Sequence, residues 1–249
     1  MPALHNSEIM HQTTQPRFIV LVSADSAWRV IREFHDQEFL PTPFGEAFIT
    51  EKFKGECDSP VCYMQAGWGK IAAAAATQYA IDTWRPDLLI NIGTCGGFRG
   101  QVQRGEIILV QRTIVYDLHV EIGDPQEEIA HYTTVFEQKW PENLLPPGLR
   151  AGTILTGDRD IIAADVPHLV ASHGALGADW ESGAVAYVAN RNNVRCIILR
   201  GVSDLVGPDG GEAYGAGNTL YEESTVTILQ ELERQLPQWL WIAAVHAGW

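Results

Sequence analysis

Short runs of apolar residues recur along the chain and are separated by stretches of helical or irregular character. The runs are rich in Ile, Leu and Val, and most are flanked by turn or helix signals, which is typical of strands buried on both faces of a sheet. This pattern predicts strands at Phe18–Val22, Val61–Gln65, Leu88–Ile92, Ile107–Val110 and Cys196–Leu199.

Helical segments separate some of these strands. Lys70–Thr83 is nearly all alanine and other small residues, which favours a closely packed helix, and Glu181–Asn190 and Glu222–Gln235 are predicted as further helices. Because strands and helices alternate, we predict a three-layer α/β domain with a largely parallel sheet. Glu121–Glu142 is acidic and weakly periodic and is interpreted as an irregular excursion, and Pro141–Pro147 as a surface loop.

The composition allows a sizeable core. Of 249 residues, 46% are hydrophobic and 19% are charged. Residues 1–17 are polar, lack the apolar stretch of a signal peptide and are predicted to form a flexible N-terminal tail before one domain over residues 18–249. The four cysteines show no CxxC spacing, so we expect free thiols in a reducing compartment, the cytoplasm.

The excess of acidic over basic residues limits the kinds of molecule that the protein is expected to bind. Asp and Glu number 31 against 17 Lys and Arg, which gives a net charge of −14. Such a chain is not expected to bind nucleic acid or an anionic membrane, and no run approaches the roughly 20 apolar residues of a membrane span. The eight histidines are scattered, without HExxH or clustered Cys/His ligands, so we expect neither a metal nor a cofactor. A small-molecule substrate fits this balance.

A glycine cluster follows the second predicted strand. Gly67-Trp68-Gly69-Lys70-Ile71-Ala72 matches the GxGxxA pattern, in which backbone amides at a helix start hold a pyrophosphate. That pattern also needs an acid after the next strand, whereas Asp87 precedes its strand. A tight turn that packs a helix against the sheet is at least as good an interpretation.

A second cluster, Gly93–Phe98, directly follows Leu88–Ile92 and contains Thr94, Cys95 and Gly96. Glycines at the carboxyl end of a buried strand let a ligand approach the backbone, and Thr94 adds a hydroxyl. The alternative is a strained turn into the next strand. The cluster lacks a lysine, so it is not a strong phosphate cradle.

Two acids lie where elements begin or end. Asp204 comes shortly after Cys196–Leu199, where α/β enzymes place acid–base groups, and burial there would raise its pKa enough to donate a proton. The alternative is a helix N-cap. Glu181 begins a small, apolar helix, so its carboxylate either grips a polyol such as ribose or favours the helix dipole beside an Asp179 cap.

Four motifs in order resemble the nucleoside phosphorylase/nucleosidase superfamily, and most closely 5′-methylthioadenosine/S-adenosylhomocysteine nucleosidase. They are Gly67-Trp68-Gly69-Lys70, Asn91-Ile92-Gly93-Thr94-Cys95-Gly96-Gly97, Thr156-Gly157-Asp158, and Trp180-Glu181-Ser182 with Arg200-Gly201-Val202-Ser203-Asp204. The resemblance spans about Phe18 to Gln235. It implies a three-layer α/β/α domain whose twisted, mixed sheet partly closes into a barrel, and hydrolysis of the N-glycosidic bond of a purine nucleoside.

The resemblance also implies roles for the site residues. Asp204 protonates N7 of the leaving purine, and Glu181 holds the ribose and stabilises its cationic transition state. Ser203 and Arg200 orient Asp204 and the nucleophile end of the site, and Thr94 lies near the attacking water or phosphate. The other residues expected to bind the substrate are Cys95, Gly96, Trp180, which packs on the ribose, and Ile161.

The chain departs from the family pattern at two places. An ungapped alignment puts Trp28 where nucleosidases carry a glutamate that activates water, and Asp25 is the candidate substitute. Asp160 stands where the family's purine-stacking aromatic is expected, and it belongs either to the base subsite or to a loop in which Asp158 and Asp160 pair with Arg159.

Two alternative functions remain at this point. A phosphate-dependent phosphorylase needs cationic residues for phosphate, but Asn91 replaces the usual arginine. Phosphate would be needed only in that case. A catalytically impaired nucleoside sensor is favoured by Trp28 in place of the acid. Because the family usually assembles through the surface near the active site, we expect a homodimer.

Overall fold

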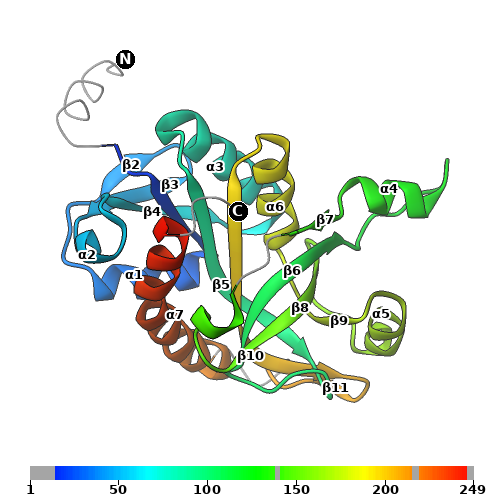
Figure 1. Cartoon of the computed structure of the whole chain (residues 1–249). Helices are drawn as coiled ribbons and strands as arrows, with labels where there is room; N and C mark the ends of the chain where they lie inside the picture. Colours follow the sequence, from blue (N-terminus) through cyan, green and yellow to red (C-terminus); the bar gives the residue numbers. More distant parts are fainter. Residues whose placement is uncertain (1–14, 138–140, 215–218, 246–249) are drawn as a thin grey trace.

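A computed structural model describes residues 15–137, 141–214 and 219–245 (Figure 1). The strands are β1 (Phe18–Ser23), β2 (Leu40–Thr42), β3 (Gly45–Thr50), β4 (Val61–Gly67), β5 (Leu88–Phe98), β6 (Ile107–Val115), β7 (Thr134–Val135), β8 (Leu149–Thr156), β9 (Ala175–Asp179), β10 (Arg195–Gly207) and β11 (Gly210–Gly211). The helices are α1 (Asp25–Phe34), α2 (Lys54–Cys57), α3 (Gly69–Trp84), α4 (Pro125–His131), α5 (Val166–His173), α6 (Ser182–Arg191) and α7 (Thr219–Val245). Residues 1–14 of the predicted tail lie outside the described residues.

Alternate residues of the central strands point into two separate hydrophobic cores. In β1, Phe18, Val20 and Val22 pack with side chains of α1 and α7. Ile19 and Leu21 face the opposite way, into a core shared with α3 and α6. A sheet covered on both faces needs apolar residues at every position, which explains why β1 reads as a continuous apolar run. The predicted three-layer α/β class is confirmed.

Five strands close into a ring. β5 pairs with β10, β10 with β6, β6 with β8, β8 with β9, and β9 returns to β5. The β5–β9 and β10–β6 pairings are antiparallel, while β5–β10, β6–β8 and β8–β9 are parallel. The sheet is therefore mixed and partly barrel-like, as the resemblance implied, instead of largely parallel. On the far side of β5, the sheet continues as β1, β4, β3 and β2.

The second glycine cluster and the segment that contains Asp204 both lie inside long strands. The cluster Gly93–Phe98 is the second half of β5, so its interpretation as a strained turn is wrong. Asp204 lies inside β10, so its interpretation as a helix N-cap is wrong as well. The β5–β10 register shifts between Val202 and Asp204. A β-bulge of this kind redirects side chains locally and is common beside active sites.

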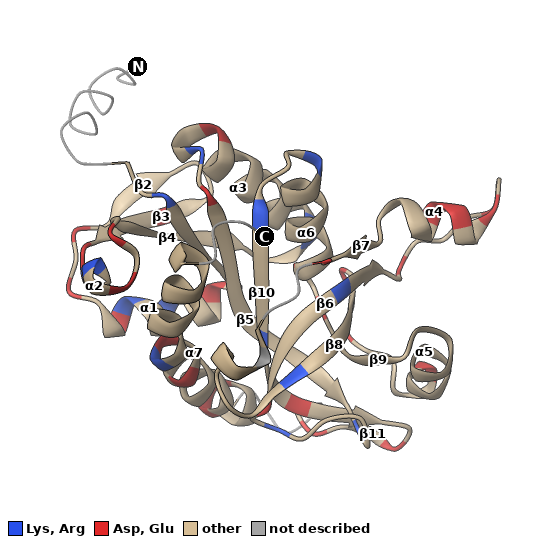
Figure 2. Cartoon of the chain, viewed as in Figure 1, with Lys and Arg blue, Asp and Glu red and all other residues tan. Residues whose placement is uncertain are grey.

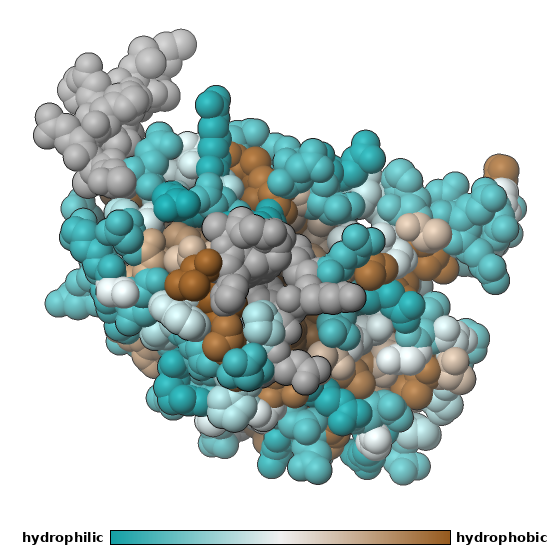
Figure 3. Space-filling view, viewed as in Figure 1, coloured by the Kyte–Doolittle hydropathy of each residue, from teal (hydrophilic) through white to brown (hydrophobic). Residues whose placement is uncertain are grey.

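The helices and the projecting arm complete the molecule. Contacts join α7 to β10, β5 and α1, and join α3 to α6 and β4. Figure 1 shows α4 reaching away from the body, and Figure 2 shows that it carries acidic residues while the central strands are mostly uncharged. The surface in Figure 3 is mainly hydrophilic, with apolar side chains in scattered groups. Among the described residues, no helix is both long and apolar enough to cross a membrane.

Several elements differ from the predicted ones. The five predicted strands and three predicted helices all exist, but β5 and β10 run well past their apolar halves. Glu121–Glu142 was expected to be irregular, yet it contains α4 and β7. Asp124 starts α4 by accepting a hydrogen bond from the Gln126 amide at 2.8 Å, with Pro125 at the first helical position.

The close pairing of β9 with β5 requires glycine at position 177. A Cβ added at Gly177 would lie 2.3 Å from the carbonyl oxygen of Gly96, and backbone cannot move aside as a side chain can. We therefore expect Gly177→Ala to lower the free energy of unfolding by about 2–3 kcal/mol, measured by urea denaturation.

Gly55→Ala is the matched control. It lies in α2, and an added Cβ would meet nothing within 4 Å. This variant should keep or slightly raise the stability, because alanine favours a helix. Equal stabilities of the two variants would contradict the role of Gly177.

Candidate active site

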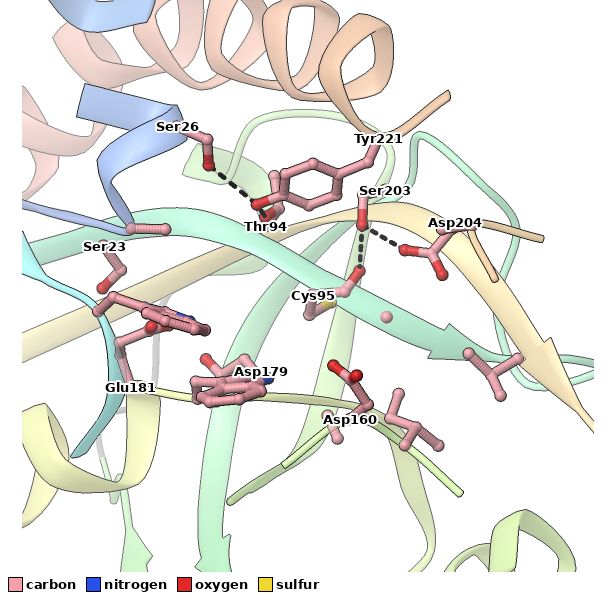
Figure 4. A pocket seen from close by; sticks show the side chains of 18 of the residues that line it. Ser23, Ser26, Thr94, Cys95, Asp160, Asp179, Glu181, Ser203, Asp204 and Tyr221 are labelled. Carbon is pink, nitrogen blue, oxygen red and sulfur yellow. Dashed lines mark hydrogen bonds between the residues drawn. The ribbon is translucent and has the colours of Figure 1, made fainter. Parts of the chain in front are cut away.

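A cavity of about 630 Å³ opens where β5, β9 and β10 pass the first turn of α1 and the start of α7. It is lined by nearly all the residues expected from the sequence: Asp25, Thr94, Cys95, Gly96, Ile161, Trp180, Glu181, Ser203 and Asp204. The remaining one, Arg200, is fully buried beneath them. Figure 4 shows Thr94, Cys95, Glu181, Ser203 and Asp204 around the cavity. Segments more than a hundred residues apart thus meet at one place, which local sequence cannot show.

Asp204 is a buried carboxyl group with a hydroxyl partner. The Ser203 hydroxyl lies 2.7 Å from Oδ1 of Asp204 and 3.1 Å from the carbonyl oxygen of Cys95 (Figure 4). Burial raises the pKa of Asp204, and the nearby carboxylates of Glu212 and Asp160 raise it further, while the Ser203 hydrogen bond lowers it. Because burial dominates, Asp204 is biased toward the protonated form that a general acid needs.

Glu181 is the second buried carboxyl group of the cavity. Its Oε1 accepts a hydrogen bond from the Gly69 amide at 3.0 Å. Burial and the neighbouring Asp179 carboxylate raise the pKa of Glu181 to about 7, against the opposing effects of Arg200 and the Gly69 amide. A carboxyl group poised near neutrality can hold either a hydroxyl or a developing positive charge.

Below Glu181, a buried ion pair forms the floor of the cavity. Nε of Arg200 donates to Oδ2 of Asp179 at 2.6 Å, and both side chains are almost completely buried. The guanidinium also donates to Oδ1 of Asn91 at 2.5 Å and lies 3.4 Å from the Ser23 hydroxyl. Its hydrogen bonds therefore join β10 to β9, β5 and β1. None of these contacts is with Asp204, so the expectation that Arg200 orients Asp204 and the nucleophile end of the site stays a prediction.

Asp179 ends β9, three residues before α6 begins at Ser182. Its carboxylate accepts the Ser182 amide at 3.2 Å and the Thr156 hydroxyl at 2.8 Å, and it contacts the Ser182 hydroxyl. One free amide at the start of the helix is thus satisfied by Asp179, although Glu181 and not Asp179 occupies the N-cap position. Because Glu181 lies at this N-cap, its position is set by the turn from β9 into α6.

The GxGxxA segment binds carboxylates of the chain itself. The Gly69 amide donates to Glu181, and the Lys70 amide donates to Oδ1 of Asp158 at 2.8 Å. The Lys70 ammonium lies 2.5 Å from Oδ1 of Asp117. The N-terminus of α3 therefore holds two protein acids at the place where the dinucleotide interpretation puts a pyrophosphate, and the structure favours the turn interpretation.

The two departures from the family pattern have structural explanations. Trp28 does not face the cavity: it is 3% exposed, packs in the core with Phe48, and its indole nitrogen donates to Glu46 at 3.2 Å. Asp25 does line the cavity, and its Oδ1 accepts a hydrogen bond from Gln65 at 2.7 Å. The amphipathic pattern of α1, with Ala27, Trp28, Val30 and Ile31 buried, would have revealed the inward direction of Trp28.

The loop after β8 forms another wall. Asp160 and Ile161 line the cavity, while Arg159 lies 3.5 Å from Asp165 instead of pairing with Asp158 or Asp160. The Tyr214 hydroxyl donates to the Ile161 carbonyl oxygen at 2.6 Å and so holds this loop.

At the outer edge, Trp180 stacks on Trp68 with ring centroids 4.8 Å apart and planes at 27°. Trp180 reaches the cavity, and Trp68 is 62% exposed. The pair adds an aromatic surface at the edge of the cavity.

Two hydroxyl-bearing residues of the cavity, Ser26 and Tyr221, were not predicted from the sequence. Tyr221 of α7 lies 3.0 Å from the Ser26 hydroxyl and 3.3 Å from the Thr94 hydroxyl, measured between oxygens. Thr94 was expected at the site, whereas Ser26 and Tyr221 come from two helices with no local motif. Among the described residues, no group of three or more His, Cys, Asp or Glu side chains is arranged to hold a metal ion.

The raised pKa of Glu181 makes a prediction for stability. Between its ordinary value of 4.5 and about 7, the folded state holds a proton that the unfolded state has released, so the stability of the wild type falls as the pH rises through this window. Glu181→Gln removes this titration. The free energy of unfolding of the variant minus that of the wild type should therefore increase by about 2 kcal/mol from about pH 5 to about pH 8. Urea denaturation at both pH values measures this change, and an unchanged difference between the two proteins would contradict it.

Comparison with known proteins gives the same picture as the motifs. The family model described as "Phosphorylase superfamily" matches residues 18–232. A 5′-methylthioadenosine nucleosidase of Arabidopsis thaliana is 27% identical over 216 residues, which are 82% of this chain and 79% of that protein. A 5′-methylthioadenosine/S-adenosylhomocysteine nucleosidase of Marinomonas sp. is 25% identical and covers 74% of this chain and 84% of its own length.

The fold is likewise shared. The apo structure of the Arabidopsis thaliana 5′-methylthioadenosine nucleosidase superposes with a TM-score of 0.72 at 21% identity, over 89% of this chain and 96% of that one. A Campylobacter jejuni 5′-methylthioadenosine/S-adenosyl homocysteine nucleosidase gives a TM-score of 0.70 at 19% identity, over 90% and 99% of the two chains. With its sequence matched over most of its length and its barrel-like sheet reproduced, this chain belongs to the phosphorylase superfamily.

Proposed function

We propose that this protein hydrolyses the N-glycosidic bond of a purine nucleoside of the 5′-methylthioadenosine or S-adenosylhomocysteine type. The observation that carries this proposal is the pair of buried carboxyl groups, Asp204 and Glu181, whose pKa values are both raised and which line one cavity. The names of the relatives agree, since they are nucleosidases that act on these compounds. Two acids held in different environments are typical of glycosidic bond cleavage.

Asp204 is the proposed general acid. As the bond between the sugar and the purine breaks, its electron pair passes to the purine, and the Asp204 proton moves to N7 of the leaving base. The protonated base leaves more easily, and general acid catalysis of this kind typically contributes about 10²–10⁴-fold. Ser203 fixes the carboxyl group through the 2.7 Å contact, and the bulge in β10 directs it into the cavity.

Glu181 is proposed to bind the ribose hydroxyls. As the sugar becomes cationic, a carboxylate beside it stabilises the transition state more than the ground state. Substrate hydroxyls replace part of the solvation that burial removes, so they favour the ionised form of Glu181. The Gly69 amide holds Oε1 in place, and a carboxylate has further lone pairs that can accept hydrogen bonds from the sugar.

The remaining predicted residues are proposed to bind the substrate around these two acids. Cys95 and Gly96 present backbone at the floor of the cavity, and Ile161 and Trp180 supply apolar walls. Arg200 is assigned a supporting role through Asp179, because its guanidinium contacts Asp179 and Asn91. Asp25 lies at the open side, where substrate and solvent enter.

The charges of the cavity favour hydrolysis over phosphorolysis. Among the described residues that line it, the acids outnumber the cations: Asp25, Asp160, Asp179, Glu181 and Asp204 face only Arg29 and Arg159. A phosphate dianion needs cationic side chains that bind it in two-point contacts, and Arg200 is already bound to Asp179. The alternative of an impaired sensor rests on the missing acid at the position of Trp28, and the burial of Trp28 in the core does not supply that acid. The turnover assay below distinguishes the sensor from a hydrolase. The homodimer and the cytoplasmic location expected from the sequence stay proposals.

Asp204→Asn tests the assignment of the general acid. The amide keeps the shape of the side chain but has no proton of comparable acidity, so kcat for release of adenine from 5′-methylthioadenosine should fall by about 10²–10⁴-fold. The assay measures adenine and reducing sugar, with and without phosphate.

Asp58→Asn is the matched control, because Asp58 is exposed and has a left-handed conformation that asparagine also adopts. It should retain the wild-type rate. Turnover of the wild type only when phosphate is present would overturn hydrolysis, and full activity of Asp204→Asn would overturn the role of Asp204. Tight nucleoside binding without turnover by the wild type would instead support a sensor.

A further inference from the structure

A group of three hydroxyls occupies one wall of the cavity. Tyr221 reaches in from α7 and contacts Ser26, in the first turn of α1, and Thr94, in the middle of β5. Figure 4 shows the three side chains together, across the cavity from Glu181, Asp179 and Asp160. All three side chains are half-buried and line the cavity.

This group has hydrogen-bonding capacity to spare. Three hydroxyls carry three donor protons, and two contacts within the group use only two of them. Each oxygen also has lone pairs that these contacts do not exhaust. At least one donor and several acceptor positions therefore remain for a small polar molecule in the cavity, and water is the smallest that fits this chemistry.

The carboxylates of the cavity nearest in sequence or space to this group already have partners in the chain. Asp25, which precedes Ser26, accepts a hydrogen bond from Gln65, and Trp28 of the same helix is buried in the core. Asp179 is bound to Arg200, and Glu181 accepts a hydrogen bond from the Gly69 amide. The three hydroxyls, in contrast, have hydrogen-bonding capacity left for a water molecule.

The general acid lies on the strand next to Thr94. Asp204 of β10 pairs in register with Gly96, and Thr94 lies two residues before Gly96 on β5, or about 7 Å along that strand. Asp204 and the three hydroxyls line the same cavity. A sugar bound in this cavity would therefore have the acid and the hydroxyls among its neighbours.

We propose that Tyr221, held by Ser26 and Thr94, positions the attacking water in place of a carboxylate base. This inference rests on the proposed hydrolysis. The bond from the sugar to the purine breaks first, and Asp204 gives its proton to the purine. The water oxygen then adds to the cationic sugar carbon, and its surplus proton leaves to the solvent at the open side beside Asp25. A hydroxyl suffices because addition to a cation needs orientation more than removal of a proton.

Tyr221→Phe removes only the hydroxyl and tests this role. We expect kcat for 5′-methylthioadenosine hydrolysis to fall by about 10–100-fold with KM changed less than about threefold, because the water contacts only the reacting state. The second readout is the product formed in a water–methanol mixture. Without the Tyr221 hydroxyl, water is no longer positioned and competes less well with methanol for the sugar cation. The ratio of methyl glycoside to free sugar should therefore rise several-fold. A purely structural role would not change this ratio.

The matched control is Tyr187→Phe. Tyr187 lies on α6, outside the residues that line the cavity, and its hydroxyl is 3.2 Å from Nε2 of His131 on α4. This variant should keep the wild-type rate and the wild-type product ratio, and thermal denaturation should show both variants folded. Thr94→Val should shift the product ratio in the same direction as Tyr221→Phe.

A rate and a product ratio within twofold of wild type for folded Tyr221→Phe would overturn the role of Tyr221 and leave the proposed hydrolysis standing. A wild type that cleaves no nucleoside without phosphate would overturn the hydrolysis and this inference together. If Tyr221→Phe lowers kcat but leaves the product ratio unchanged, Tyr221 acts on the sugar or the base and not on water, which also overturns the proposal.

Discussion

The buried ion pair between Arg200 and Asp179 is the interaction on which the site depends. It joins the middle of β10 to the end of β9, and through Asn91 and Ser23 it reaches β5 and β1. Burying two charges away from water destabilises the folded state unless each charge is fully paired. Removing one partner would leave the other charge buried and unpaired, which is strongly destabilising. The pair therefore fixes in a single arrangement the strands that carry Thr94 and Asp204 and the turn after β9 that carries Glu181.

The same pair explains why the cavity can be so acidic. Because Arg200 is paired with Asp179, its positive charge only partly offsets the effect of burial on Glu181. Burial therefore raises the pKa values of both Glu181 and Asp204. The net charge of −14 thus has a local counterpart: acids gather where a cationic sugar would form. A pocket of this character stabilises a short-lived cation and repels anions.

Much of the fold could be predicted from the pattern of apolar residues, and most site residues could be predicted from the motifs. The buried runs of β1, β4 and β6 were clear because both faces of these strands are covered. The second halves of β5 and β10 were not clear, because glycines, Ser203 and Asp204 face a cavity instead of a core, and the apolar signal stops where the site begins. Closure of the ring through β8 and β9 depends on pairings between distant segments that no local window contains.

Tyr221 illustrates what the sequence leaves out. It lies in the first turn of α7, a long helix whose apolar face packs in the core. Its place beside Ser26 follows only from the packing of α7 against α1. Trp28 shows the reverse case, in which an ungapped alignment assigned a site position to a side chain that the helix period turns inward. Positions on helices beside a cavity therefore need the helix phase as well as the alignment.

The closed ring has a consequence for how the protein acquires its activity during folding. β5 and β10 are about a hundred residues apart in the chain, so the ring closes only after most of the polypeptide has been made and brought together. Long-range pairings of this kind are reached late, because the entropy of the intervening loop is lost before their contacts form. The acid on β10 and the hydroxyl on β5 thus come into position in the same final step, and a chain truncated before β10 would be without either a closed barrel or a competent site.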